Sequence, residues 1–140
     1  MPKPQFLYHG SQYLFDVVYP RQAQGVSTHE SQKAIYAAET IDEVIPFALP
    51  IRWYPDDPTG KRAFSCKNRK TLIEYGSLDP DGVGYVYKLN ADTFEKLDDW
   101  QWISRSEAVP VEVICIRVED YIHTISFSEQ AKEIQKKLFG

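Results

Sequence analysis

Apolar residues recur in short alternating runs along much of the chain, and this pattern predicts β-strands more often than helices. The clearest run is Val111–Val118, which reads Val-Glu-Val-Ile-Cys-Ile-Arg-Val. The same criterion predicts further strands at Gln5–Tyr8, Ala34–Ala38, Thr71–Tyr75 and Val83–Leu89, and one that begins at Trp102–Ile103. The polar segments between them are predicted as loops at Arg21–Lys33 and Arg52–Lys70, a turn at Asp79–Gly82 and a connector at Phe94–Trp100.

Two segments have the features of helices instead. Ile41–Leu49 follows Thr40, a possible N-cap, and has acidic residues in its first turn, although Pro46 is expected to kink or shorten it. Ser128–Leu138 starts with a capping serine and carries apolar residues at helical spacing along one stripe. Many short strands with two helices predict an α+β fold whose core is mostly antiparallel.

Composition narrows the class of protein. The chain has 140 residues, of which 43% are hydrophobic and 26% charged, so we expect a single globular domain over residues 1–140. A net charge of -4 gives no reason to expect duplex DNA or an anionic membrane as partner. No window reaches the ~20 apolar residues of a membrane span, and no signal-peptide-like stretch follows the first residues. We therefore expect a cytoplasmic protein.

The cysteines and histidines do not form a recognisable metal motif. Cys66 and Cys115 are far apart, and two cysteines alone cannot complete a structural zinc site. Cys115 lies within an apolar run, so we expect a small buried side chain there. Phosphate-loop, dinucleotide-turn, metalloprotease and serine-hydrolase motifs are also missing from the sequence. The sequence therefore predicts no metal.

A basic run lies within the predicted loop Arg52–Lys70. It consists of Lys61, Arg62, Lys67, Arg69 and Lys70. Five cations in this space can contact phosphates or an acidic partner, or they can form a solvated loop balanced by the acidic remainder of the chain. The sequence leaves both interpretations open.

Two local features are candidates for ligand binding. His9-Gly10-Ser11 is predicted to end the first strand in a turn, where glycine allows close backbone approach. Tyr36 lies in a strand flanked by alanines, which leave room for a flat ring to stack on it. Taken singly, the three positions fit better as a capping histidine, a bend and a core aromatic residue than as a binding site. Their order along the chain, before a helix, favours a binding site.

The same residues carry a resemblance to a known family. Leu7-Tyr8-His9-Gly10-Ser11, followed by Ala34-Ile35-Tyr36-Ala37-Ala38-Glu39 and a helix, resembles the ADP-ribosyltransferase fold. The likeness is to the diphtheria-toxin and poly(ADP-ribose) polymerase branch, whose site is written His-Tyr-Glu, and to small bacterial and phage proteins that open with Leu-Tyr-His-Gly-Ser. It implies an α+β fold with a split, mainly antiparallel β core and a few flanking helices.

The resemblance also implies NAD as a substrate and assigns roles in binding it. His9 corresponds to the histidine that hydrogen-bonds the adenosine ribose. Gly10, followed by Ser11, corresponds to the segment that presents its backbone to the nicotinamide carboxamide. Tyr36 corresponds to the tyrosine that stacks on the nicotinamide ring.

The glutamate of the family pattern has no direct counterpart. By register, Gln101 in Trp100-Gln101-Trp102-Ile103-Ser104 takes its place as the catalytic residue. If the register differs, Asp99, Glu107 and Glu112 are the nearby acids, although the last two also fit a loop charge and the solvent face of a strand. A carboxylate stabilises the positive charge that develops on the ribose during cleavage. A charge pair at ~4 Å is worth about 4 kcal/mol, roughly a thousandfold in rate, and the glutamine amide lacks that charge.

Three functions remain open from the sequence. The first is an NAD-binding, ADP-ribosyltransferase-like protein that modifies an unidentified protein or nucleic-acid target, slowly because of Gln101. The second is a non-catalytic binding module that keeps the transferase fold, with or without the nucleotide pocket. The third is a relative of NAD-using RNA phosphotransferases, which needs further histidines and arginines that the sequence does not place.

Overall fold

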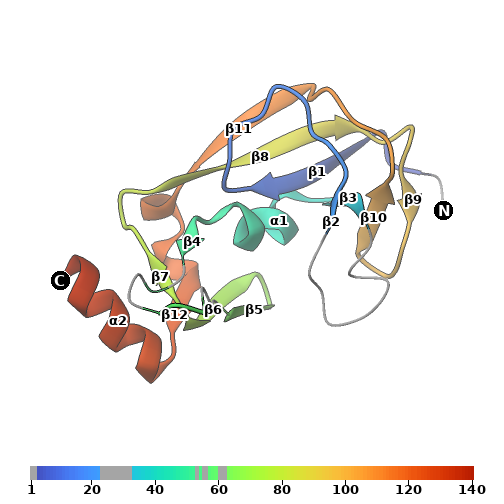
Figure 1. Cartoon of the computed structure of the whole chain (residues 1–140). Coiled ribbons are helices and arrows are strands. Elements are labelled where there is room, and N and C mark those ends of the chain that lie inside the picture. The colour runs from blue at the N-terminus through green and yellow to red at the C-terminus, as the bar shows by residue number, and fades with distance from the viewer. Residues whose placement is uncertain (1–2, 23–32, 53, 55–56, 60–62) are drawn as a thin grey trace.

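The computed structural model describes residues 3–22, 33–52, 54, 57–59 and 63–140. Its main sheet has the order β11-β8-β1-β3-β10-β9, with β2 beside β3 (Figure 1). These strands are β1 (Phe6–Ser11), β2 (Arg21–Gln22), β3 (Lys33–Ala38), β8 (Val83–Asn90), β9 (Glu95–Lys96), β10 (Gln101–Ser104) and β11 (Glu112–Arg117). Every pairing within this sheet is antiparallel, which confirms the expected α+β class with a mostly antiparallel core.

Smaller elements form the other half of the molecule, below the main sheet in Figure 1. They comprise α1 (Ile41–Ala48), β4 (Ile51–Arg52), β5 (Ala63–Lys67), β6 (Lys70–Tyr75), β7 (Ser77–Leu78), 3-10 turns at Val118–Asp120 and Ile122–Thr124, β12 (Ile125–Phe127) and α2 (Glu129–Phe139). β4 pairs with β7. β6 lies between β5, to which it is antiparallel, and β12, to which it is parallel. The sequence pattern did not reveal β4, β7 or β12, which are two or three residues long.

Alternation of side chains gives the main sheet two buried faces. On one face Ala38, Val86 and Ile116 pack with Val44 and Ala48 of α1. The opposite face buries a second cluster, which contains Leu7, Ile35, Tyr87, Leu89 and Trp102, against the segment that follows β1. A strand residue thus faces either the helix or this segment, and the register decides which.

Two glycines allow α1 to lie directly on the sheet. A Cβ at Gly10 would overlap the Val44 carbonyl oxygen, and a Cβ at Gly84 would overlap that of Ala48. β1 continues through Gly10 to Ser11, which pairs with Tyr85 of β8. The predicted turn at His9-Gly10-Ser11 is therefore wrong, because this glycine makes room for a helix within a continuous strand.

Three predicted loops also contain strands. β2 begins the segment Arg21–Lys33, where Arg21 pairs with Ala34, and β9 interrupts the predicted connector Phe94–Trp100. The segment Arg52–Lys70 contains β5, which forms a hairpin with β6. Residues 23–32 and the cations Lys61 and Arg62 lie outside the described residues. Glycine, proline and charge in these segments obscured the alternation that the strands require.

Helix ends agree well with the sequence. Ser128 caps α2, where its Oγ accepts a hydrogen bond from the Ala131 amide at 3.1 Å. Thr40 stands at the N-cap of α1, but its hydroxyl donates to Glu43 Oε1 at 2.8 Å and not to a backbone group. Within the described part of the chain, no helix is long and apolar enough to cross a membrane.

The prediction for Cys115 is wrong, since its side chain is exposed. β11 is the edge strand of the main sheet, and Val113 and Cys115 lie on the same face as Tyr87 and Tyr85 of β8 but stay exposed at this edge. An apolar run on an edge strand thus does not imply burial on both faces.

Candidate functional site

The three segments of the sequence motif lie on neighbouring strands. β3 stands between β1 and β10, where Tyr8 pairs with Ala38 and Ala38 pairs with Gln101. These three paired residues form a row across the strands. His9 is one residue after Tyr8 on β1, and Tyr36 is two residues before Ala38 on β3, so both lie on the same side of this row. Residues separated by as much as 92 positions, Gln101 and His9, are thereby brought to one region of the sheet.

The sheet opens between β1 and β3 immediately beyond this row. Both strands have six residues, yet they pair only at Tyr8 and Ala38, whereas β1 pairs with β8 along its whole length. His9 spans the opening through a 2.7 Å hydrogen bond between its Nδ1 and the Tyr36 carbonyl oxygen. The edge of β1 at 9–11 that faces β3 therefore has no ladder partner there, and its backbone groups can receive a ligand.

The environment of His9 favours its neutral form. Burial lowers the pKa of the imidazole below 6.5; the hydrogen bond to Tyr36 opposes this shift, and the positive charge of Arg21 adds to it. Because a carbonyl oxygen only accepts, the proton of the neutral ring resides on Nδ1. Nε2 then carries a lone pair that can accept a hydrogen bond from a ligand hydroxyl.

Strand alternation separates the predicted side chains into two groups. Tyr36 and Gln101 face the same side of the sheet as Tyr8, which packs with the α1 cluster. The ring of His9 lies on the opposite side, with its centroid 6.2 Å from that of Tyr87. Ser11 also alternates to this side, and its Oγ accepts a hydrogen bond from the Tyr13 amide. The structure thus places Tyr36 beside the row of Gln101, while His9 reaches Tyr36 through its backbone.

Gln101 has an unused hydrogen-bonding atom. Its backbone amide donates to Asp98 Oδ1 at 2.7 Å, but its buried Oε1 accepts no hydrogen bond from any described residue. Leaving such an atom unpaired costs about 1–3 kcal/mol, so it is a natural acceptor for a ligand hydroxyl. Of the alternative acids, Glu112 lies on β11, separated from β3 by two strands, and is exposed. Glu112 therefore does not lie beside Tyr36.

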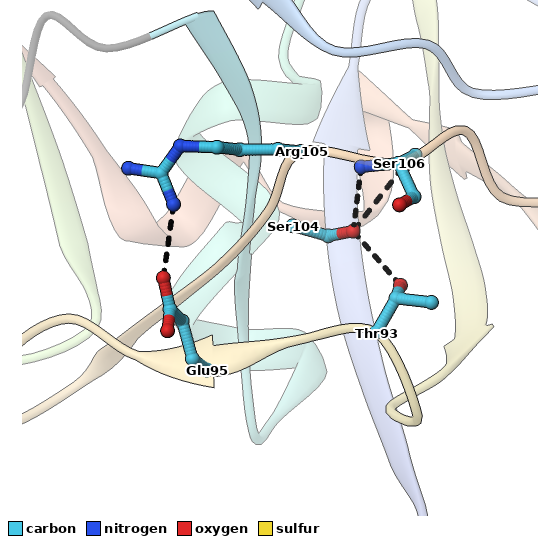
Figure 2. A network of polar contacts seen from close by, with 5 residues as sticks. All are labelled: Thr93, Glu95, Ser104, Arg105 and Ser106. Carbon is cyan, nitrogen blue, oxygen red and sulfur yellow. Dashed lines mark hydrogen bonds and ion pairs between the residues drawn. The ribbon is translucent and has the colours of Figure 1, made fainter.

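A set of polar contacts fixes the end of β10 (Figure 2). The buried Ser104 Oγ lies 2.8 Å from Thr93 Oγ1 and accepts a hydrogen bond from the Ser106 amide at 3.1 Å. Beside it, Arg105 forms a 2.9 Å ion pair with Glu95 of β9. These contacts hold the strand that carries Gln101 against its neighbour.

The face that carries His9 is hollowed next to β2. An open hollow of about 500 Å³ is lined by Leu14, Phe15, Asp16, Val17, Tyr19 and Arg21. Phe15 stacks on Tyr87 with ring centroids 5.9 Å apart, and the Arg21 guanidinium lies 4.6 Å from the centre of the Phe15 ring. Tyr87 fixes this segment, since its hydroxyl accepts from the Phe15 amide at 2.7 Å and donates to the Tyr13 carbonyl at 2.6 Å. Sequence reasoning missed Phe15 and Arg21, whose only signal was an aromatic-rich segment after the motif.

Among the described residues, no three His, Cys, Asp or Glu side chains gather as metal ligands. Comparison of the chain with protein-family models, curated proteins and solved structures finds no match in any of the three.

Proposed function

We propose that this protein binds NAD at the opening between β1 and β3 and transfers its ADP-ribose slowly to an acceptor. The observation that carries the proposal is the bond from His9 to the Tyr36 carbonyl at the point where strand pairing stops, one residue beyond the row that contains Gln101. It joins the histidine and tyrosine positions of the resemblance at an open strand edge, next to the row in which Gln101 pairs with Ala38. The split core of the ADP-ribosyltransferase fold is part of the same proposal.

The nicotinamide half fits the side that faces α1. The Tyr36 ring offers a stacking surface there. The backbone of residues 9–11, which does not pair with β3, can form hydrogen bonds with a carboxamide, which has one acceptor and two donors. Gln101 Oε1, buried and without a partner among the described residues, can accept from a ribose hydroxyl. The residues present therefore fit this half of NAD.

The adenosine half fits the opposite side. The Nε2 lone pair of His9 can accept from the second ribose, and the Arg21 guanidinium can contact the anionic pyrophosphate. The Phe15 ring beneath Arg21 lines a hollow with room for a flat base. A dinucleotide that lies along the opening would contact His9 and Tyr36 on the two sides that strand alternation gives them.

Transfer requires cleavage of the glycosidic bond between ribose C1 and the nicotinamide nitrogen. The bond's electron pair leaves with nicotinamide, the acceptor nucleophile forms a new bond to C1, and the acceptor's proton passes to water. Positive charge builds on the ribose in the transition state, and the neutral amide of Gln101 stabilises it less than a carboxylate does. Slow transfer follows because glutamine has an amide nitrogen where glutamate has a second carboxylate oxygen.

An assay of nicotinamide release tests this proposal directly. Gln101→Glu is expected to raise the rate by up to roughly a thousandfold, from a charge interaction of about 4 kcal/mol. Gln130→Glu, an exposed position on α2, is the matched control and is expected to leave the rate unchanged. Absence of NAD binding to the wild type in titration calorimetry at millimolar concentration would exclude the proposal.

Gln101 also favours a second candidate, a binding module that holds NAD without cleaving it. The same experiment separates the two functions. NAD binding by both proteins, with no nicotinamide released by either, identifies the non-catalytic module.

A further inference from the structure

The tip of the β5–β6 hairpin carries exposed cations that oppose one another. Lys67 is paired directly across the hairpin with Lys70, and Arg69 lies in the connecting turn. Like charges directly opposite on paired strands are destabilising, whereas a lysine opposite a glutamate is favourable. The pairing of Lys67 with Lys70 therefore does not stabilise the fold.

The turn itself is also unfavourable for its residues. Asn68 and Arg69 have φ angles of 52° and 62°, the left-handed conformation of a two-residue hairpin turn. Asparagine tolerates this conformation, but glycine is preferred at the second position, where the Cβ of an arginine is crowded by the backbone. The Lys67–Lys70 pair and Arg69 in the turn are both unfavourable for the fold, and both add positive charge at the tip. This combination points to an anionic partner.

Lys67 and Lys70 alternate to the outer face of the hairpin, whereas Phe64 faces inward, opposite the buried Ile73. Aromatic side chains continue from this inner face toward Gln101. Arg69 contacts Asp42 at the start of α1 at 3.4 Å, and Phe64 of β5 meets Phe47 near the end of α1 with ring centroids 5.9 Å apart. Phe47 stacks on Trp100, the residue before Gln101, at 6.3 Å and an interplanar angle of 20°. Phe47 and Trp100 remain 42% and 38% exposed, so the stacked pair is accessible.

We infer that single-stranded nucleic acid binds around the hairpin tip, on a surface formed by the cations Lys67, Arg69 and Lys70 and, on the inner side, by Phe47, Phe64 and Trp100. Phosphates lie against the cations, and a base packs on the aromatic pair, the combination by which single strands are held without sequence preference. Duplex bases are stacked on each other and cannot use such a platform. Because Trp100 adjoins Gln101, the bound strand would also be the acceptor of ADP-ribose, and this role rests on the proposed function. Binding of the strand does not rest on it.

Fluorescence anisotropy with a labelled 12-nucleotide single-stranded DNA, without NAD, tests the inference. The wild type is expected to bind with an affinity that falls as salt rises. Lys70→Glu is expected to weaken binding at least tenfold and lower the salt dependence, yet raise Tm because it removes the Lys67–Lys70 repulsion. Trp100→Ala is expected to weaken binding about tenfold, the effect of losing one stacked base.

Matched controls come from α2, which lies at the opposite end of the molecule from β10 in Figure 1. Lys137→Glu and the exposed Phe139→Ala likewise change a lysine and an aromatic residue, and both variants are expected to bind as the wild type does. Equal losses in the control and hairpin variants, or no binding by the wild type at low salt, overturn the inference.

A competition arm identifies the class of partner. If polyglutamate displaces the oligonucleotide at equal charge concentration, the surface is an acidic-protein site and the nucleic-acid assignment is wrong. NAD titration of the same variants keeps the two proposals apart. Oligonucleotide binding without NAD binding removes the proposed function alone, and the reverse result removes the nucleic-acid surface alone.

Discussion

His9 links the stability of the fold to pH through its own titration. Burial holds its pKa in the folded protein below the ordinary 6.5, so above pH 6.5 the ring is neutral in both the folded and the unfolded state. As the pH falls through 6.5, the unfolded chain binds the proton first. The free energy of unfolding therefore decreases from pH 6.5 down to the folded-state pKa.

Asparagine at position 9 removes this titration while offering an amide N–H in the place of Nδ1. In urea denaturation between pH 7.5 and pH 5.5, we expect the wild type to lose more stability than His9→Asn. The other histidines are common to both proteins, so their contributions cancel in the difference. Equal losses would show that the imidazole of His9 titrates normally in the folded state.

At the scale of elements, the contact between α1 and the main sheet depends on glycine. The Cα of Gly84 lies so close to the helix that a Cβ would overlap the Ala48 carbonyl oxygen, and backbone cannot rotate away as a side chain can. Gly84→Ala must therefore shift α1, whose buried residues form the core beside the sheet.

The expected cost of Gly84→Ala is about 1–3 kcal/mol in the free energy of unfolding, the range for overpacked cores. Chemical denaturation measures it, with Ser65→Ala on the exposed side of β5 as a control that should change stability little. A Gly84→Ala protein as stable as the wild type would mean that α1 is not held against β8 in solution.

At the scale of the whole molecule, the two sides of the sheet are expected to bind different halves of NAD. ADP contains only the adenosine half. Arg21→Gln should weaken binding of both NAD and ADP about tenfold, the effect of removing a hydrogen bond to a charged group. Tyr36→Ala should weaken binding of NAD and leave ADP unchanged.

Titration calorimetry of both variants with NAD and with ADP gives the four dissociation constants that this comparison needs. Arg52→Gln is the matched control, because its guanidinium lies 5.7 Å from the Tyr13 ring centre in a similar arrangement but outside the residues that line the hollow. If Arg21→Gln and Arg52→Gln bind ADP equally well, the adenosine half lies elsewhere.

The sequence by itself determined the features that depend on neighbouring residues. The 3.6-residue spacing and Ser128 predicted α2, and period-two runs predicted β3, β6, β8 and β11 to within a few residues. The α+β class with antiparallel pairing followed from the number and shortness of these runs. Local propensity and side-chain periodicity act over a few residues, which is why a single sequence reveals them.

Tertiary structure alone decided which strands became neighbours and which faces they presented. The exposure of Cys115 depends on β11 being an edge strand, and the role of Gly10 depends on a helix that begins 31 residues later at Ile41. The motif predicted that His9, Tyr36 and Gln101 act together, but the strand register set them on two sides of one sheet. Strand pairing joins distant residues through backbone hydrogen bonds that every sequence can make, so the pattern of side chains along the chain does not specify it.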